Sequence, residues 1–201
     1  RHGQASFGAA DYDQLSPLGA RQASATGAAL AARGLRPDVL VRGGLRRHEQ
    51  TARSLVEGAG WTGVPVRTEP GWDEIDHLGL MPRYDESPDH QDPRTFQAAY
   101  ERALRRWIGD AAGAADHEPF ARFVARVVEG LHQAADEAGP GRTVVVVTSA
   151  GPLGVACAKS GELLALFEAG VTALMLTAPV ASRRKIDRLA QAAARGCDLT
   201  V

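Results

Sequence analysis

The sequence predicts an α/β domain of three layers, an αβα sandwich in which helices cover both faces of a mostly parallel central sheet. Two observations favour this class. Short apolar runs alternate along the chain with helical stretches. One run, from Thr143 to Val147, is almost wholly valine, which suits a strand buried on both faces. Ligands of such sheets bind beyond the carboxyl ends of the strands, so the loops after the strands are the places to look for function.

The composition is that of one globular domain spanning residues 1–201. Apolar residues make up 44% of the 201 positions, enough for a real core. With 23 basic and 24 acidic side chains, the net charge of −1 gives no reason to expect nucleic-acid or anionic-membrane binding. No apolar run reaches the roughly 18 residues needed to cross a bilayer, and Cys157 and Cys197 lack the spacing of a metal site. We therefore expect a cytoplasmic protein.

Helix and strand signals alternate through the first third of the chain. A helix of about 17 residues is expected from Pro17, with Ser16 as its N-cap and Gly34 just beyond its end. A strand over residues 38–41, a helix over about 46–58 and a strand over 64–68 follow.

The middle and the end of the chain continue the pattern after an interruption. Residues 70–92 hold three prolines and many acids, and we expect a long irregular insertion that covers the active site. Helices are then predicted over about 93–108 and 119–138, a strand over 143–147 and a helical stretch over 153–158. Residues 171–177 form a further possible strand, and residues 181–196 look helical.

Three loops that should follow strands are rich in polar groups: residues 1–4, 42–50 and 148–151. By composition alone they could be a solvated chain end and a wet, arginine-rich helix face. The patterns RHGQ, LSPLGARQA and LRRHEQTA, however, occur in this order. They resemble the motifs of the histidine phosphatase superfamily, which includes the phosphoglycerate mutases. The resemblance covers roughly the first 75 residues well and fades after about Ala158.

The resemblance implies a phosphate pocket with four principal residues. His2 would attack phosphorus and form a phosphohistidine, which splits one difficult displacement into two easier ones. Gly3 would let the backbone come close to the phosphoryl group. Arg1 and Arg47 would hold the phosphoryl oxygens, because planar guanidinium groups donate in pairs to phosphate and stay charged at any working pH.

The resemblance places the general acid at Glu74, within the segment from Trp72 to His77. Glu74 could equally be one exposed carboxylate of an acidic loop, and Asp73 and Asp76 are alternatives for the acid. Crowding by like charges would raise the pKa of a carboxyl group here and suit it to that role.

One catalytic residue of the family is replaced. The family has a second histidine after the valine-rich strand, and this chain has Ser149 at that place. A serine carries no positive charge, so we expect a loss on the order of 10²-fold or more in rate. Ser149 could still line the pocket with the backbone N–H groups of Ala150 and Gly151. We expect neither His48 nor His77 to take over the missing role.

Two further departures concern the ends of the chain. Ser6 stands near the place where many members have asparagine, and we expect it to contact phosphate. No closing strand is evident near the carboxyl end. Because the RHG tripeptide of the family follows a central strand, we also expect a short apolar strand upstream of Arg1.

These observations leave two main hypotheses for function. The first is a metal-independent phosphomonoester phosphatase without organic cofactor, acting through phospho-His2 on a small phosphorylated metabolite or a phosphoprotein. The second is a catalytically impaired pseudoenzyme that binds phosphate or phosphorylated partners. A phosphoglycerate mutase is less favoured, because no extra basic lid for a bisphosphate is visible. An α/β domain unrelated to phosphate would require three ordered motifs to arise by chance. The oligomeric state is open, and a dimer is compatible with the sequence.

Overall fold

The computed structural model describes residues 1–6, 13–84, 93–110, 117–158, 173–175 and 198–200. In chain order its elements are α1 (Pro17–Ala32), β1 (Val39–Arg42), α2 (Arg46–Ala59), β2 (Val66–Thr68), the 3₁₀ turn η1 (Pro70–Trp72), α3 (His77–Arg83), α4 (Pro93–Gly109), α5 (Phe120–Ala138), β3 (Val144–Val147), α6 (Ala150–Ala158), β4 (Ala173–Met175) and β5 (Asp198–Thr200). Within these ranges no helix combines the length and the apolar character that a membrane span requires.

The central sheet has the strand order β2-β1-β3, and its described pairs are parallel. Leu40 of β1 is in register with Val66 of β2 and with Val145 of β3. The predicted mixed α/β class with a parallel sheet is therefore confirmed. Strands β4 and β5 form a separate parallel pair, and β5 was not foreseen from the sequence.

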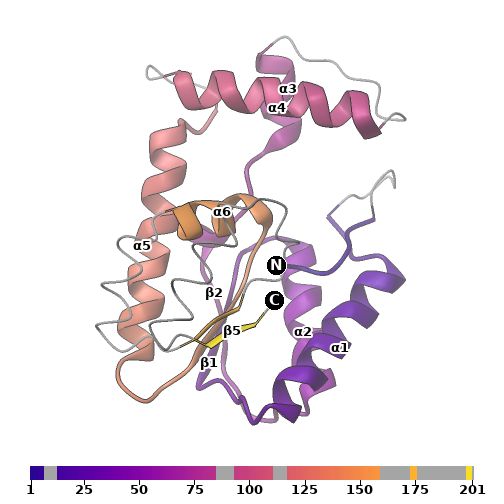
Figure 1. The fold of residues 1–201 in the computed structure, drawn as a ribbon, viewed down its shortest axis with the longest axis vertical. Coiled ribbons are helices and arrows are strands. Elements are labelled where there is room, and N and C mark those ends of the chain that lie inside the picture. The colour runs from indigo at the N-terminus through magenta and orange to yellow at the C-terminus, as the bar shows by residue number, and fades with distance from the viewer. Residues whose placement is uncertain (7–12, 85–92, 111–116, 159–172, 176–197, 201) are drawn as a thin grey trace.

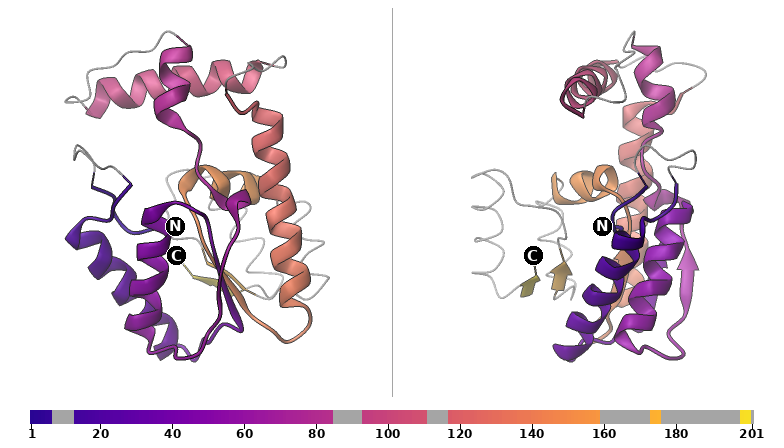
Figure 2. Two further views of the ribbon diagram at one scale, coloured as in Figure 1. Left: turned by 180° about the vertical axis from the view of Figure 1, so that it is seen from behind. Right: turned by 90° about the vertical axis from the view of Figure 1, so that its right-hand side faces the viewer.

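Successive side chains of the central strands point to opposite faces of the sheet and pack into two separate hydrophobic clusters. Val39 and Val41 of β1 pack in one cluster with residues of α4 and α5, whereas Leu40 packs in a second cluster with residues of α1 and α2. A parallel strand covered on both faces needs apolar residues at every position, which explains the apolar sequence of β1, whose residues 39–41 are buried. In β3, predicted to be buried on both faces, only Val147 is buried and residues 144–146 are half-buried. Figure 1 shows α1 and α2 on one side of the sheet and α5 on the other, as the predicted three layers require. The view from behind in Figure 2 (left) shows the same separation.

The first helix forms where its terminal signals predicted it. The Ser16 hydroxyl accepts a hydrogen bond from the backbone N–H of Gly19 at 3.0 Å, and Pro17 occupies the first helical turn. Gly34, beyond the last turn, has a positive φ of 77°, a conformation in which glycine avoids a steric penalty.

The predicted irregular insertion at residues 70–92 is in part helical. It contains η1 and α3, while residues 85–92 lie outside the described part. The prolines of this stretch had predicted an irregular segment, but Pro82 lies inside α3, close to its end. Together α3 and α4 stand apart at one end of the molecule (Figure 1). The predicted helical stretch at 181–196 also lies outside the described residues.

Helices α1 and α2 touch through glycines. A Cβ atom added to Gly27 of α1 would lie 2.0 Å from the carbonyl oxygen of Leu55, and one added to Gly58 of α2 would lie 2.1 Å from that of Ser24. No real Cβ atom tolerates such contacts, so both positions require glycine for the two helices to pack this closely.

We predict that Gly27→Ala lowers the free energy of unfolding by about 1–3 kcal/mol, because the added methyl group forces α1 away from α2. Urea denaturation followed by circular dichroism measures this. Gly154→Ala in α6 is the matched control, since a Cβ there meets nothing within 4 Å. It should leave stability unchanged or raise it by up to about 1 kcal/mol. Equal effects of the two substitutions would contradict the packing argument.

Candidate active site

Three segments that are distant in sequence meet at the carboxyl ends of β1 and β3. The backbone N–H of His2 donates to the carbonyl oxygen of Thr148 at 2.8 Å. The Thr148 hydroxyl donates to the carbonyl oxygen of Trp72 at 2.6 Å. The backbone N–H of Gly3 donates to the Thr51 hydroxyl of α2 at 3.1 Å. The predicted convergence of the loops after the strands is thus found, with the segment before Glu74 added to it.

The His2 imidazole is held in one tautomer. Its Nδ1 lies 2.6 Å from the carbonyl oxygen of Gly3, and since a carbonyl only accepts, Nδ1 carries the proton. The pKa of His2 is lowered to about 4, mainly by burial and also by the charges of Arg47 and Arg1, against the opposing effect of the bond to Gly3. The neutral ring therefore keeps the lone pair of Nε2 available for attack.

Gly3 is needed for close approach of the backbone to α1. A Cβ atom at Gly3 would lie 2.3 Å from the carbonyl oxygen of Gly19, and one at Gly19 would lie 2.1 Å from the carbonyl oxygen of Gln4. The two glycines of the RHG and LSPLG motifs thus face each other. This contact positions the His2 segment on the start of α1.

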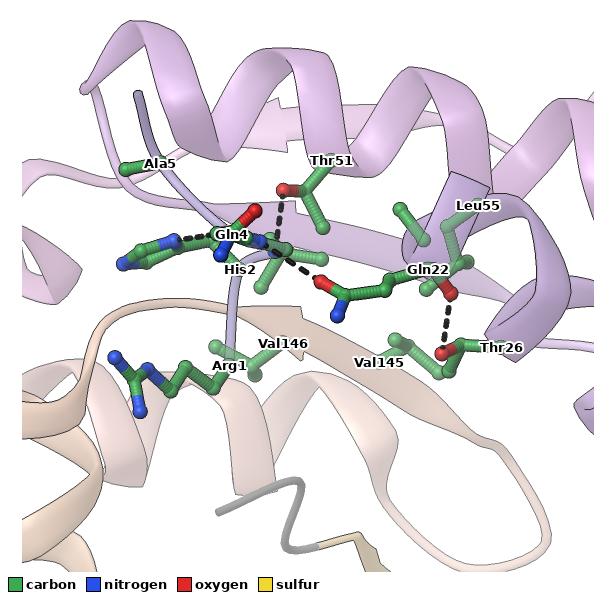
Figure 3. Close-up of a pocket in the computed structure, with 13 residues that line it drawn as sticks. Arg1, His2, Gln4, Ala5, Gln22, Thr26, Thr51, Leu55, Val145 and Val146 are labelled. Atoms are coloured by element: carbon green, nitrogen blue, oxygen red, sulfur yellow. Dashed lines mark hydrogen bonds between the residues drawn. The ribbon is translucent and has the colours of Figure 1, made fainter. Parts of the chain in front are cut away.

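A pocket of about 460 Å³ runs from His2 along β3. Its lining comes from the first residues of the chain, from α1, from α2 and from β3: Arg1, His2, Gly3, Gln4, Ala5, Gln22, Ala23, Thr26, Thr51, Leu55, Val145, Val146 and Val147. Figure 3 shows the side chains of Arg1 and His2 extending to the same end of this pocket, away from Gln22 and Thr26. Gln22 accepts a hydrogen bond from the backbone N–H of Gln4 at 3.0 Å, which fixes one wall.

Arg47 is buried. Composition alone would have suggested that it lies on a solvent-exposed helix face. Only 5% of it is exposed, and its Nη1 lies 2.7 Å from Oδ1 of Asp13. Its carbonyl oxygen accepts from the Thr51 hydroxyl at 2.7 Å. The neighbouring Arg46 is exposed and uses its backbone N–H to bond Asp13. A buried cation needs an anionic partner, and Asp13 supplies one while Arg47 remains close enough to lower the pKa of His2.

Of the three carboxylates in the acidic loop, Glu74 faces the turn that contains Ser149. The backbone N–H of Gly151 donates to Glu74, at 3.2 Å to Oε1 and 3.1 Å to Oε2, and the N–H of Ile75 donates to Oε1 at 3.0 Å. Glu74 is therefore not a freely solvated carboxylate. The N–H of Gly151, expected to meet phosphate, is bonded to Glu74 here.

The two alternative acids have other partners. Asp76 caps α3 by accepting from the N–H of Gly79 at 3.0 Å. Asp73 accepts from the N–H of Gly44 at 2.5 Å, and burial raises its pKa. Neither arrangement directs these carboxylates to the turn at Gly151, which among the three carboxylates Glu74 contacts.

Ser149 does not stand alone. Its hydroxyl lies 2.6 Å from Nε2 of His48, and both residues are 0% exposed. The ring centroid of His48 is 5.7 Å from that of His2. Burial, followed by the effects of the neighbouring His2 and Arg47, lowers the pKa of His48 to about 3, so its ring is neutral. The sequence places His48 next to Arg47, but it did not predict the contact between His48 and Ser149.

Other sequence candidates are placed less decisively. Ser6 bonds through its backbone N–H to the carbonyl oxygen of Gln14 and leads into residues 7–12, outside the described part. Ala150 is exposed at the start of α6. His77 packs edge-on against Phe96 and Tyr100 of α4, with ring centroids 6.5 and 6.2 Å away. Within the described ranges no group of three or more His, Cys, Asp or Glu side chains could hold a metal ion.

Sequence reasoning missed Asp13 and the role of Thr51. Thr51 lies inside the LRRHEQTA motif, so a signal for it was present. Asp13 lies in no motif, and its pairing with Arg47 spans 34 positions of the sequence. Only the folded chain reveals that contact.

The structure is similar to several solved structures, one of which is a named phosphatase. A mycobacterial glucosyl-3-phosphoglycerate phosphatase is 26% identical with a TM-score of 0.52, and the match covers 82% of this chain and 77% of that one. A protein described as mycobacterial hydrolase 2 is 27% identical with a TM-score of 0.54, covering 82% and 70%. The YhfR protein of Bacillus stearothermophilus, at 21% identity and a TM-score of 0.58 over 81% and 77%, shows the common fold.

The family assignment comes from a match along most of the chain. No curated protein matches the sequence significantly. The model of the histidine phosphatase superfamily (branch 1), however, matches residues 1–171, which include every residue of the site described above. The chain therefore belongs to the histidine phosphatase superfamily (branch 1), a family of hydrolase and mutase-like enzymes.

Proposed function

We propose that this protein is a metal-independent phosphomonoester phosphatase that works through a phosphohistidine at His2 and acts on a small phosphorylated molecule. The observation that carries the proposal is the state of His2. Its ring is neutral, its Nδ1 proton is bonded to Gly3, and its Nε2 is left as the nucleophile beside the charges of Arg1 and Arg47.

In the first step, Nε2 of His2 attacks phosphorus and the ester P–O bond breaks. Arg1 and Arg47 stabilise the charge that develops on the phosphoryl oxygens. The protonated carboxyl group of Glu74 gives its proton to the departing oxygen, which leaves as an alcohol.

In the second step, the Glu74 carboxylate takes a proton from water as the water oxygen attacks phosphorus. The N–P bond breaks, phosphate leaves, and His2 and Glu74 return to their starting states. The backbone N–H groups of Ile75 and Gly151 hold the Glu74 carboxyl group throughout.

The substrate class rests on similarity. A mycobacterial protein to which the chain is similar acts, by its name, on glucosyl-3-phosphoglycerate, a phosphorylated small molecule. This favours a small phosphorylated metabolite over a phosphoprotein. It also favours hydrolysis over mutase chemistry.

The burial of Ser149, which brings no charge to the site, favours a second candidate, a phosphate-binding protein with little turnover. The two functions differ in whether His2 becomes covalently phosphorylated.

We predict that the protein hydrolyses an aryl phosphate in the presence of a chelator and that His2→Ala abolishes this hydrolysis. Rapid acid-free quenching with radiolabelled substrate should trap phosphate on the wild-type protein and not on the variant. Arg53→Ala, on the exposed side of α2, is the control and should hydrolyse normally. Phosphate binding without turnover or labelling would instead establish the binding protein.

A second prediction concerns the leaving group. Glu74→Gln should lower kcat/KM for an alkyl phosphate on the order of 10²–10⁴-fold, because an alkoxide leaves poorly without a proton. The loss should be much smaller for an aryl phosphate whose phenol leaves readily. Asp76→Asn, which keeps a capping side chain on α3, serves as the control and should leave kcat/KM unchanged for both substrates. Equal losses on both substrates would remove Glu74 from the role of acid.

A third prediction concerns protonation of His2. Its folded pKa of about 4 lies below the ordinary value of 6.5, so the nucleophile stays neutral as the pH falls and is lost only as the pH passes through about 4. NMR titration of the ring, assigned by comparison with His2→Ala, measures this. A midpoint near 6.5 would contradict the burial of the ring as described.

A further inference from the structure

The contact between His48 and Ser149 is not used by the mechanism above, although it lies beside the nucleophile. The two side chains are fully buried and come from separate elements, α2 and the turn after β3. Their polar atoms are 2.6 Å apart, a short hydrogen bond, and 101 positions of sequence separate them. A buried serine hydroxyl needs such a partner, but a backbone carbonyl would serve equally well. An imidazole 5.7 Å from the His2 ring is therefore a specific choice of partner.

The bond can be made in two ways, and they differ in what the hydroxyl offers to substrate. If His48 Nε2 accepts, the Ser149 hydroxyl donates its only proton to His48 and has none left for substrate. If Nε2 carries the ring proton and donates, the hydroxyl proton is free for an outside acceptor. A phosphoryl oxygen can only accept, so substrate on His2 selects the second arrangement.

On the other side of the His48 ring, no hydrogen bond with the described residues fixes the proton on Nδ1. The nearest carboxylate oxygen, Oδ1 of Asp73, is 3.9 Å away from Nδ1. Asp73 instead accepts from the N–H of Gly44. The proton of the neutral ring can therefore reside on Nε2. The charged groups nearby, Arg42 and Arg47, also oppose a second proton on the ring.

We propose that Ser149 and His48 together replace the single histidine that the family has at position 149. Ser149, fully buried in this structure, is the catalytic residue that donates to a phosphoryl oxygen at His2 once bound substrate displaces the groups that cover it, and His48 is a positioning residue that donates Nε2–H to Ser149 Oγ. No proton leaves either residue during the reaction. This inference rests on the proposed phosphatase function and deepens it.

The test is a double-mutant cycle on aryl phosphate hydrolysis with kcat and KM measured separately. Ser149→Ala should lower kcat on the order of 10²-fold, as expected for loss of one donor to the transition state. His48→Leu, which fills the space of the ring without a hydrogen bond, should lower kcat by a similar factor. Because the two residues act as one unit, the double variant should lose little more than either single variant. KM should change much less than kcat in each variant, because the lost donor acts mainly in the transition state.

His48→Gln provides the rescue that a purely structural role would not require. Its side-chain amide offers an N–H near the position of Nε2 and cannot ionise, so kcat should recover to within about tenfold of wild type. His132→Gln on the exposed face of α5 is the matched control and should leave kcat unchanged. Thermal unfolding of each variant separates lost folding from lost catalysis.

Several results would overturn the proposal. An active wild type whose kcat survives Ser149→Ala overturns it whether or not the His48 variants fold. Losses that multiply in the double variant, or failure of folded His48→Gln to recover, also overturn it while the phosphohistidine mechanism stands. A wild type that neither turns over substrate nor labels His2 removes the proposed function and this inference together.

Discussion

The arrangement of the site depends on the two hydrogen bonds of Thr148. Its carbonyl oxygen holds the backbone of His2, and its hydroxyl holds the carbonyl oxygen of Trp72, two residues before Glu74. Thr148 directly follows β3, and it is 3% exposed. One residue at the end of one strand thereby sets the distance between the proposed nucleophile and the proposed acid. A parallel sheet makes this possible because its strands end at the same edge.

The second constraint is the close approach of backbones around the nucleophile. Gly3 lies against Gly19, and α1 packs on α2 through glycines further along. These contacts bring the start of α1 and the start of α2 to the same place, so that Thr51 can bond Gly3 while Arg47 lies near His2. Burial at this junction has an electrostatic consequence. Two histidines and an arginine share a small volume, and the imidazoles respond by staying neutral, which is the state that nucleophilic attack requires.

The replacement of a histidine by Ser149 therefore does not leave a gap. A charged imidazole has been exchanged for a neutral hydroxyl whose position is set by a second, neutral imidazole. In the proposed mechanism such an arrangement supplies a directed hydrogen bond without a charge, so the guanidinium groups would carry a larger share of the stabilisation of the phosphoryl oxygens. The physical difference from the family pattern is one of charge, while the imidazole ring remains within a few ångströms of the site.

The sequence alone determined the fold class and the limits of most of the described helices and strands, and it predicted the nucleophile. These follow from local signals: the cap at Ser16, the valine runs of β1 and β3, and short motifs whose residues are neighbours in the chain. It left open which of three carboxylates is the acid, it gave no partner to Arg47, and it did not predict that a histidine contacts Ser149. The tertiary structure shows the contacts of these residues, and each joins distant positions of the chain: Glu74 with Gly151, Arg47 with Asp13, and Ser149 with His48. A side chain's burial and partner are set by the packing of separate elements, and no local pattern contains that information.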